Sequence, residues 1–277
     1  MTSQQEKADR LAALHERERV FVIPNPWDAG TARLLAYLGF EALATTGAGV
    51  AFSLGKPDGS TSRDEMLAHV EVIAGATDLP VSADLEDGFG DEPDEVHDFI
   101  LTAARTGIVG GSIEDRSYGR GARPMHQSYD LDFAAERIRA AADAARSLPF
   151  RFTLTARCEN FLVGNTDLAD TIRRLQAYQA AGADCLYAPG LTTKAQIREV
   201  VAALDRPVNV VMGLVGEPIP VKELEELGVR RVSVGSALSR TALGSFVAAA
   251  TELRDQGTFG FASGAISHPD LCKIFAS

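Results

Sequence analysis

Residues 79–90 read Leu-Pro-Val-Ser-Ala-Asp-Leu-Glu-Asp-Gly-Phe-Gly, and this stretch decides the fold. The extended apolar run over 79–84 predicts a buried strand, and the amphipathic stretch over 92–106 predicts the helix after it. Between them lies an acidic turn, at the place where a parallel strand would end. A strand, a polar turn and a helix in this order are typical of a βαβ unit.

The same unit recurs along the chain. The eight predicted strands cover residues 20–24, 41–46, 79–84, 108–113, 151–156, 184–188, 208–212 and 230–234. Each is followed by a helical stretch, which predicts a (β/α)8 TIM barrel. An open doubly wound sheet is the alternative, but it needs a nucleotide-type glycine fingerprint after the first strand, where the chain reads Pro24-Asn25-Pro26-Trp27.

Two predicted connections are unusually long. Residues 47–60 are predicted to form a Gly-rich loop. Residues 116–130 contain three Arg and two Gly and exceed the roughly 2 to 6 residues of an ordinary βα connection. We expect the second loop to be an active-site lid that is mobile without ligand.

The length of 277 residues suits one barrel domain, 1–277, with a C-terminal helical tail from about 257 that we expect to cover a neighbouring subunit. The net charge of -11 disfavours nucleic acid and anionic membrane surfaces as partners. Three irregularly spaced cysteines predict neither a disulfide framework nor a zinc cluster. No apolar export signal or membrane span is found, so we expect a cytoplasmic protein.

The predicted strand ends are acidic. Asp84 and Glu86 follow the third strand and Glu114 follows the fourth. Carboxylates that converge on one mouth repel one another unless a cation neutralises them, and hard oxygen ligands suit Mg2+, with Mn2+ as a substitute. We predict that Asp84 binds the metal directly, with Glu86 and Glu114 as further metal-site residues acting through water. The alternative is that these acids cap the helices that follow.

Other residues at the predicted mouth suit a small carboxylic acid substrate. Arg157 closes the fifth strand and is predicted to clamp a carboxylate, the alternative being a salt bridge with Glu114 or Glu159. Thr46, Gly47 and Ala48 offer a hydroxyl and unhindered N–H groups. Asn209, on the seventh strand, is a further candidate for substrate binding, unless it serves only turn chemistry.

Several motifs, taken together in order and spacing, resemble the isocitrate lyase and phosphoenolpyruvate mutase superfamily. They are Gly47-Ala48-Gly49-Val50, Ser53-Leu54-Gly55-Lys56-Pro57-Asp58, Ala83-Asp84-Leu85-Glu86-Asp87-Gly88-Phe89-Gly90, Ile113-Glu114-Asp115 and Ala156-Arg157. The resemblance implies a barrel whose eighth helix is exchanged between subunits, in dimers that pair into tetramers. It also implies Mg2+ on Asp84, with Glu86 and Glu114 acting largely through water. A 2-oxo acid or enolate would lie beside residues matching Thr46, Gly47, Ala48, Asp58 and Arg157.

The chain departs from that pattern in the predicted lid. Isocitrate and methylisocitrate lyases carry a cysteine there, whereas this chain reads Arg116-Ser117-Tyr118-Gly119-Arg120-Gly121-Ala122-Arg123. The phosphonate mutases carry Lys and Asn in the lid and a His after the sixth strand, where this chain reads Ala188-Pro189-Gly190. Thiol-assisted isocitrate cleavage and phosphoryl-transferring mutase chemistry are both disfavoured. Among the lid groups that remain, His126 is a candidate acid, although a lone loop histidine is usually solvated.

Together with the residues, the resemblance therefore implies a Mg2+-dependent lyase or decarboxylase that acts on a small 2-oxo or 2-hydroxy dicarboxylic acid through an enolate, with Asp58, Arg157 and Glu114 as catalytic residues. The alternatives are a C–P bond phosphonomutase or phosphonopyruvate hydrolase, and a non-catalytic 2-oxo acid binding protein. A Schiff-base aldolase is excluded because no lysine closes a predicted strand. Cys158, next to Arg157, is expected to be a buried structural thiol.

Overall fold

The computed structural model describes residues 2–120 and 123–276. Its strands are β1 (Phe21–Ile23), β2 (Leu43–Ala44), β3 (Val81–Asp84), β4 (Gly110–Glu114), β5 (Thr153–Arg157), β6 (Cys185–Tyr187), β7 (Val208–Val211) and β8 (Arg231–Ser233). They form one eight-stranded sheet in the order β1-β8-β7-β6-β5-β4-β3-β2, and every pair is parallel. The Ala44 N–H donates to the Pro24 carbonyl at 3.0 Å, which links the two ends of this order. The nearly closed barrel confirms the predicted (β/α)8 fold.

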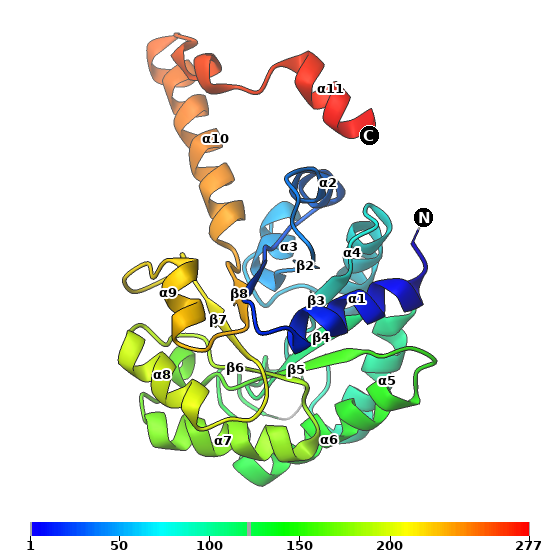
Figure 1. Ribbon diagram of the computed structural model, residues 1–277. Helices are drawn as coiled ribbons and strands as arrows, with labels where there is room; N and C mark the ends of the chain where they lie inside the picture. Colours follow the sequence, from blue (N-terminus) through cyan, green and yellow to red (C-terminus); the bar gives the residue numbers. More distant parts are fainter. Residues whose placement is uncertain (1, 121–122, 277) are drawn as a thin grey trace.

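Helices alternate with the strands around the barrel (Figure 1). They are α2 (Ala29–Tyr37), α3 (Gly47–Ser53), α4 (Arg63–Gly75), α5 (Pro93–Ala104), α6 (Leu131–Ser147), α7 (Leu168–Ala181), α8 (Lys194–Ala202) and α9 (Val221–Glu226), with a 3-10 turn η1 (Asn160–Val163). Their apolar faces pack on the outside of the strands in one large core that includes Val70, Ile100 and Leu154. Cys158 belongs to this core and is fully buried, as expected.

The N-terminal end of the barrel is closed by α1 (Gln4–Glu16). Leu11 and Leu14 of this helix pack against Phe21 and Ile23 of β1 in a second buried cluster. A side chain at Gly110 would meet Leu11 Cδ2 at 3.1 Å, so α1 lies against the start of β4. The opposite end of the barrel, where the strands finish, is formed by loops and polar residues.

The prediction of a Gly-rich loop over 47–60 is wrong in its first half, where the chain forms α3. Thr46 caps the helix by accepting the Gly49 N–H at 3.4 Å. A Cβ at Gly49 would lie 2.6 Å from the Thr46 side chain and 3.1 Å from Trp27 Cβ. The glycine serves close packing here, whereas the sequence had suggested a Gly-rich loop.

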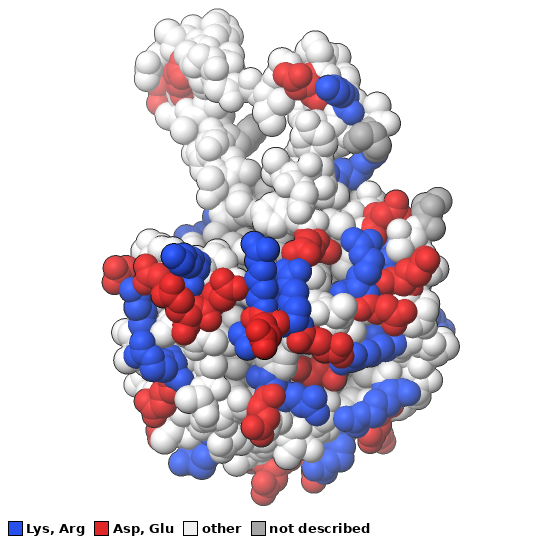
Figure 2. Space-filling model, viewed as in Figure 1, with Lys and Arg blue, Asp and Glu red and all other residues white. Residues whose placement is uncertain are grey.

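After β8 the chain forms α10 (Ala237–Gln256), the 3-10 turn η2 (Gly260–Gly264) and α11 (His268–Ala276). Figure 1 shows α10 projecting away from the barrel, and α11 returning toward α2. The space-filling view shows few charged residues on this arm compared with the barrel below it (Figure 2). Within residues 2–120 and 123–276, no helix has the length and hydropathy needed to cross a membrane.

Candidate active site

Four buried or half-buried carboxylates meet at the C-terminal ends of β3, β4 and β5. We call them the acidic cluster: Asp84, Glu86, Glu114 and Glu159. The strand register places Glu114 beside Arg157, and the Glu114 N–H donates to the Glu86 carbonyl at 3.0 Å. The parallel strands therefore bring together the residues that sequence reasoning had placed at the mouth.

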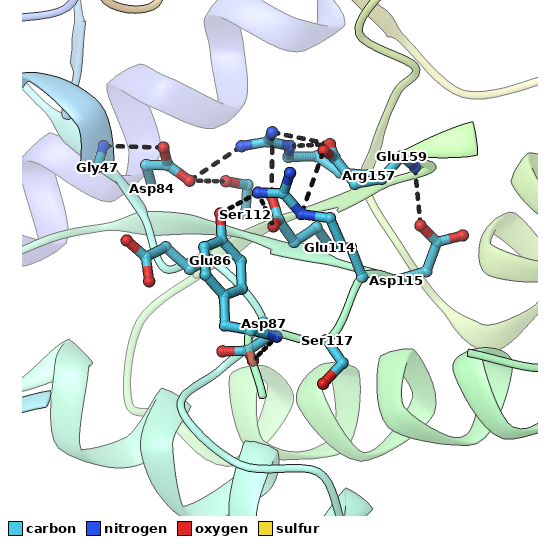
Figure 3. A network of polar contacts seen from close by, with 12 residues as sticks. Gly47, Asp84, Glu86, Asp87, Ser112, Glu114, Asp115, Ser117, Arg157 and Glu159 are labelled. Carbon is cyan, nitrogen blue, oxygen red and sulfur yellow. Dashed lines mark hydrogen bonds and ion pairs between the residues drawn. The ribbon is translucent and has the colours of Figure 1, made fainter. Parts of the chain in front are cut away.

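Arg157 neutralises most of this cluster. Its Nη1 lies 3.0 Å from Asp84 Oδ1, and its Nη2 lies 3.0 Å from Glu114 Oε2 and 2.8 Å from Glu159 Oε1. Figure 3 shows Arg157 directed between Asp84 and Glu159. The salt-bridge alternative considered for Arg157 is thus formed in this structure, while its role as a substrate clamp stays a prediction.

Glu86 is held in an unusual way. Its φ of 52° lies in the left-handed region, which is uncommon outside glycine and often marks functional sites. The side chain is 1% exposed, its Oε2 contacts Arg120, and its Oε1 has no hydrogen-bond partner. Burial raises the pKa of Glu86 to about 7, with Arg120 acting in the opposite direction.

Gly47 approaches both Glu86 and Asp84 closely. Its N–H donates to Asp84 Oδ2 at 3.0 Å. A Cβ at this position would lie 2.9 Å from Glu86 Oε1 and 3.5 Å from Asp84 Oδ2. Position 47 therefore requires glycine if these carboxylates are to keep their places. Thr46 and Ala48 flank it, at the cap and in the first turn of α3.

The donor set of the cluster fits a hard divalent cation. Besides Glu86 Oε1, Glu159 Oε2 is buried without a hydrogen bond, and the two buried Glu114 oxygens have only the ion-pair contacts to Arg116 and Arg157. Complete burial raises the pKa of Glu114 well above its usual value, against the effect of Arg157. Across the described residues no three His, Cys, Asp or Glu side chains are grouped closely enough to ligate one ion directly. This arrangement suits Mg2+ on one carboxylate with its waters held by others.

The alternative that Glu86 and Glu114 cap helices is wrong. The helix after Glu86, α5, begins at its own capping box, formed by Glu92 and Glu95. The helix after Glu114, α6, has Asp130 at its N-cap. The two acids instead pair with arginines, Glu86 with Arg120 and Glu114 with Arg116 and Arg157.

The predicted lid, 116–130, lies against the acidic cluster. Arg116 is 3.3 Å from Glu114 Oε1, and Arg120 contacts both Glu86 and Asp87. Tyr118 is buried between these two arginines, whereas His126 is exposed, as expected for a solvated loop histidine. Two residues of this segment, 121 and 122, lie outside the described residues. Sequence reasoning noted the three arginines but did not pair them with the cluster.

Asp58 lies on the loop beside this segment. The residue is exposed overall, yet desolvation of its carboxyl group, followed by the charge of Asp84, raises its pKa, while Arg116 and Arg157 lower it. These charges place Asp58 near the same mouth. A Cβ at the adjacent Gly59 would lie 2.8 Å from the Tyr118 ring, so this loop packs on the lid.

Asn209 lies deeper, in the wall of a cavity of about 60 Å³ that Asp84 and Arg157 also line. Its Nδ2 donates to Ser233 Oγ at 3.0 Å and its Oδ1 accepts from Arg231 at 2.8 Å. The structure places Asn209 in the pocket, but both of its polar groups are engaged by the protein. Arg231 was not singled out from the sequence, because an arginine at the start of a strand carries no motif.

Comparison with known proteins gives a consistent set of relatives. The family model described as phosphoenolpyruvate phosphomutase matches residues 11–254. A Corynebacterium glutamicum protein described as "Probable 2-methylisocitrate lyase 2" is 30% identical over 257 residues, covering 91% of this chain and 82% of that protein. A solved Burkholderia cenocepacia J2315 structure described as a "putative lyase/mutase" has a TM-score of 0.95 and 56% identity, covering 99% of this chain and 97% of its own. Oxaloacetate acetylhydrolase in complex with the product oxalate has a TM-score of 0.88 and 28% identity, covering 100% of this chain and 96% of its own.

Proposed function

Because this chain belongs to the phosphoenolpyruvate phosphomutase family, an enzyme family of the isocitrate lyase type, we propose that it is a Mg2+-dependent lyase or decarboxylase. Its proposed substrate is a small 2-oxo or 2-hydroxy dicarboxylic acid, which reacts through an enolate. The observation that carries the proposal is the acidic cluster, in which four carboxylates converge and Glu86 Oε1 and Glu159 Oε2 are buried without a hydrogen-bond donor.

Asp84 is the proposed direct ligand, with Glu86 and Glu114 holding water around the ion. When bound, Mg2+ (or Mn2+) supplies positive charge that draws electron density from the substrate as a bond breaks. The close approach of Gly47 to both Asp84 and Glu86 supports this assignment, because it leaves no room for a side chain beside the carboxylates.

The chain's own residues would bind and orient the substrate. We assign the Thr46 hydroxyl and the Gly47 and Ala48 N–H groups to one carboxylate of the substrate, for which the Gly47 N–H would exchange its present acceptor, Asp84 Oδ2. Arg157, once a cation competes for Asp84, is free to donate to the same carboxylate. Asp58, whose carboxyl group lies near these charges, would orient the substrate or a water.

Decarboxylation or cleavage of a substituted malate fits this site better than isocitrate cleavage. The predicted lid contains no cysteine, so a thiol cannot act as its acid. Decarboxylation needs only electron withdrawal and protonation of the enolate, and solvent can supply that proton. Oxaloacetate acetylhydrolase, which releases oxalate, is a relative whose ligand has the small dicarboxylate character proposed here.

A substrate screen tests the proposal. The purified chain is incubated with oxaloacetate, alkylmalates, methylisocitrate and phosphonopyruvate, with Mg2+ or Mn2+, and release of pyruvate or a related 2-oxo acid is measured. We expect turnover of a dicarboxylate that stops in excess chelator and falls sharply in Arg157→Ala. The matched control is Arg151→Ala, an exposed arginine just before the same strand, which should retain the wild-type rate.

Other outcomes separate the alternatives. Turnover that persists in excess chelator, or an Arg157→Ala variant with the wild-type rate, would overturn the mechanism. Turnover of phosphonopyruvate alone would favour the C–P bond enzyme. Saturable binding of a 2-oxo acid without turnover of any compound would favour a non-catalytic binding protein.

We further propose a homo-oligomer, a dimer or tetramer, in which the α10 arm packs on a second copy of the chain. Phe246, Val247 and Leu243 of α10 are exposed, the first to 70%, which is costly for a free monomer. Phe246→Asp should lower the mass measured by light scattering. Val72→Asp, which changes an exposed apolar residue of α4, is the control. An unchanged mass in Phe246→Asp would contradict this packing.

The cytoplasmic location also stays a prediction.

A further inference from the structure

A second guanidinium, that of Arg231, lies inside the barrel below the acidic cluster. Arg231 is 5% exposed and begins β8. Its Nε donates to Asn209 Oδ1 at 2.8 Å, and its Nη1 lies 3.3 Å from Nε2 of His15. Residues from β7 and α1 thus hold the guanidinium on two sides, and Nη2 forms no hydrogen bond with the described residues.

Both partners of Arg231 are uncharged. The Nδ1 of His15 lies 2.8 Å from the Leu11 carbonyl. A carbonyl only accepts, so Nδ1 carries the proton and Nε2 accepts from Arg231. Burial, followed by the charge of Arg231, lowers the pKa of His15 to about 3, which keeps the ring neutral at physiological pH. Asn209 contributes a neutral amide. Among residues 2–120 and 123–276, no carboxylate forms an ion pair with Arg231.

Arg157 provides the contrast within the same barrel. The strand register aligns Arg157 with Tyr187, Tyr187 with Asn209, and Asn209 with Arg231, so the two arginines stand in one row of paired residues across β5 to β8. Arg157 is surrounded by three carboxylates. Arg231, which is the more buried of the two, has none. An unpaired buried charge is costly, and proteins usually supply a counterion for it.

The cavity of about 60 Å³ connects the two arginines, since both line it. This volume suits a few water molecules or one small anionic group. Thr45, Ser112 and Ser233 line the same cavity. Ser233 Oγ accepts from Asn209 at 3.0 Å, which leaves its own proton for another acceptor. Asp84, the carboxylate that also lines this cavity, is paired with Arg157, which leaves the charge of Arg231 without a counterion there.

We propose that Arg231 forms an anion subsite at the floor of this cavity, for one carboxylate group of a small substrate or for a small inorganic anion. The subsite itself rests on the contacts of Arg231 alone, whereas its occupation by a substrate carboxylate rests also on the proposed function. Arg231 donates from Nη2, and Asn209 and His15 fix the plane of the guanidinium. Arg231 is a specificity-determining residue in this scheme, because a substrate arm without charge would leave it unpaired.

Bromide and formate are the probes for the subsite. The full wild-type chain, kept in chelator, is titrated with each at constant ionic strength, and the melting temperature and bromide anomalous scattering in crystals are measured. We expect saturable stabilisation and a bromide peak beside Arg231. Arg231→Met should weaken the response about tenfold or more, and Arg231→Lys should retain part of it. Arg230→Met, an adjacent arginine, is the matched control and should behave as wild type.

Substrate kinetics distinguish the two sources of the anion. If the substrate supplies it, Arg231→Met raises KM for the dicarboxylate about tenfold or more with a smaller change in kcat, and substrate displaces bromide. If an inorganic anion fills the subsite, Arg231→Met loses the stabilisation by bromide while its KM for the dicarboxylate stays at the wild-type value. A wild-type chain without saturable anion stabilisation or bromide beside Arg231 overturns the proposal, even if Arg231→Met fails to fold. Bromide binding with no turnover of any dicarboxylate would leave the subsite standing and refute the proposed function.

Discussion

At the mouth of the barrel, Glu86 is held at a φ of 52° with a buried oxygen that accepts no hydrogen bond. At the opposite end, Ser3 and Glu6 form a complete capping box for α1, and Leu11 of that helix is fully buried in an apolar cluster. The mouth collects carboxylates, a strained backbone and buried oxygens without donors, whereas α1 at the base is held by a complete capping box and by apolar contacts.

This difference between the mouth and the base indicates that function depends on one end of the barrel and stability on the other. Unfavourable interactions of the kind found at the mouth persist only when the rest of the structure enforces them. The base and the outer helices supply that enforcement through apolar burial. Changes at the mouth should therefore abolish chemistry at little cost in folding, and changes at the base should do the reverse.

The largest expected effect comes from Asp84→Ala. Removing the proposed direct ligand should abolish Mg2+ binding measured by calorimetry, beyond the roughly 10- to 100-fold loss typical of an outer-sphere partner. The variant should stay folded, because Arg157 keeps Glu114 and Glu159 as partners. Undiminished metal affinity would show that the acidic cluster is not organised around Asp84.

Leu11→Ala should have the opposite effect. Truncating this fully buried side chain leaves a cavity under β4, and such changes cost about 2 to 5 kcal/mol. Urea unfolding should report the loss, while kcat per folded molecule stays near wild type. A variant of normal stability, or one with normal stability and reduced kcat, would break the division between base and mouth.

The pH dependence of stability sharpens the comparison at one residue. The pKa of Glu86 is about 7 in the folded chain against 4.5 for the free group, so the folded state holds this proton more tightly. The stabilisation that the folded state gains by binding this proton is complete below about pH 4.5 and is lost as the pH rises toward 7. Without metal, wild type should lose roughly 3 kcal/mol more than Glu86→Gln between these values. The measurement is the free energy of unfolding in urea at a series of pH values. If it changes equally with pH in wild type and in Glu86→Gln, the raised pKa of Glu86 is contradicted.

The repeating architecture was predictable from sequence because it depends on local patterns. Each strand is predicted by a short apolar run in the sequence, and a parallel barrel places the C-terminal ends of all its strands at one mouth. Asp84, Glu114 and Arg157 were located by that rule alone, since each closes a strand. Their individual chemical roles remain predictions.

The features that sequence reasoning missed depend on contacts between distant segments. The residues of α3 were predicted to lie in a Gly-rich loop, because glycine is common both in loops and at sites of close packing. Arg120 reaches the acidic cluster from a loop more than 30 positions away. The isolation of Arg231 from every described carboxylate could not be inferred at all, because it is a property of its surroundings.

Gly47→Ala has the smallest expected effect of these variants. It should lower metal affinity and activity at the mouth without lowering the stability of the barrel. The added Cβ would lie 2.9 Å from Glu86 Oε1, closer than real contacts allow, so Glu86 or α3 must shift. Because Glu86 is an outer partner of the metal in our proposal, we expect a loss of about tenfold in Mg2+ affinity and in kcat/KM. The free energy of unfolding should change by less than about 1 kcal/mol, because alanine favours the helix more than glycine does and offsets the strain. Gly75→Ala is the matched control, since a Cβ there would meet nothing within 4 Å, and its metal affinity should equal that of wild type. If Gly47→Ala binds Mg2+ as tightly as Gly75→Ala does, the fit between Gly47 and the carboxylates has no role in metal binding. If it instead unfolds, the mouth contributes more to stability than its strained geometry indicates.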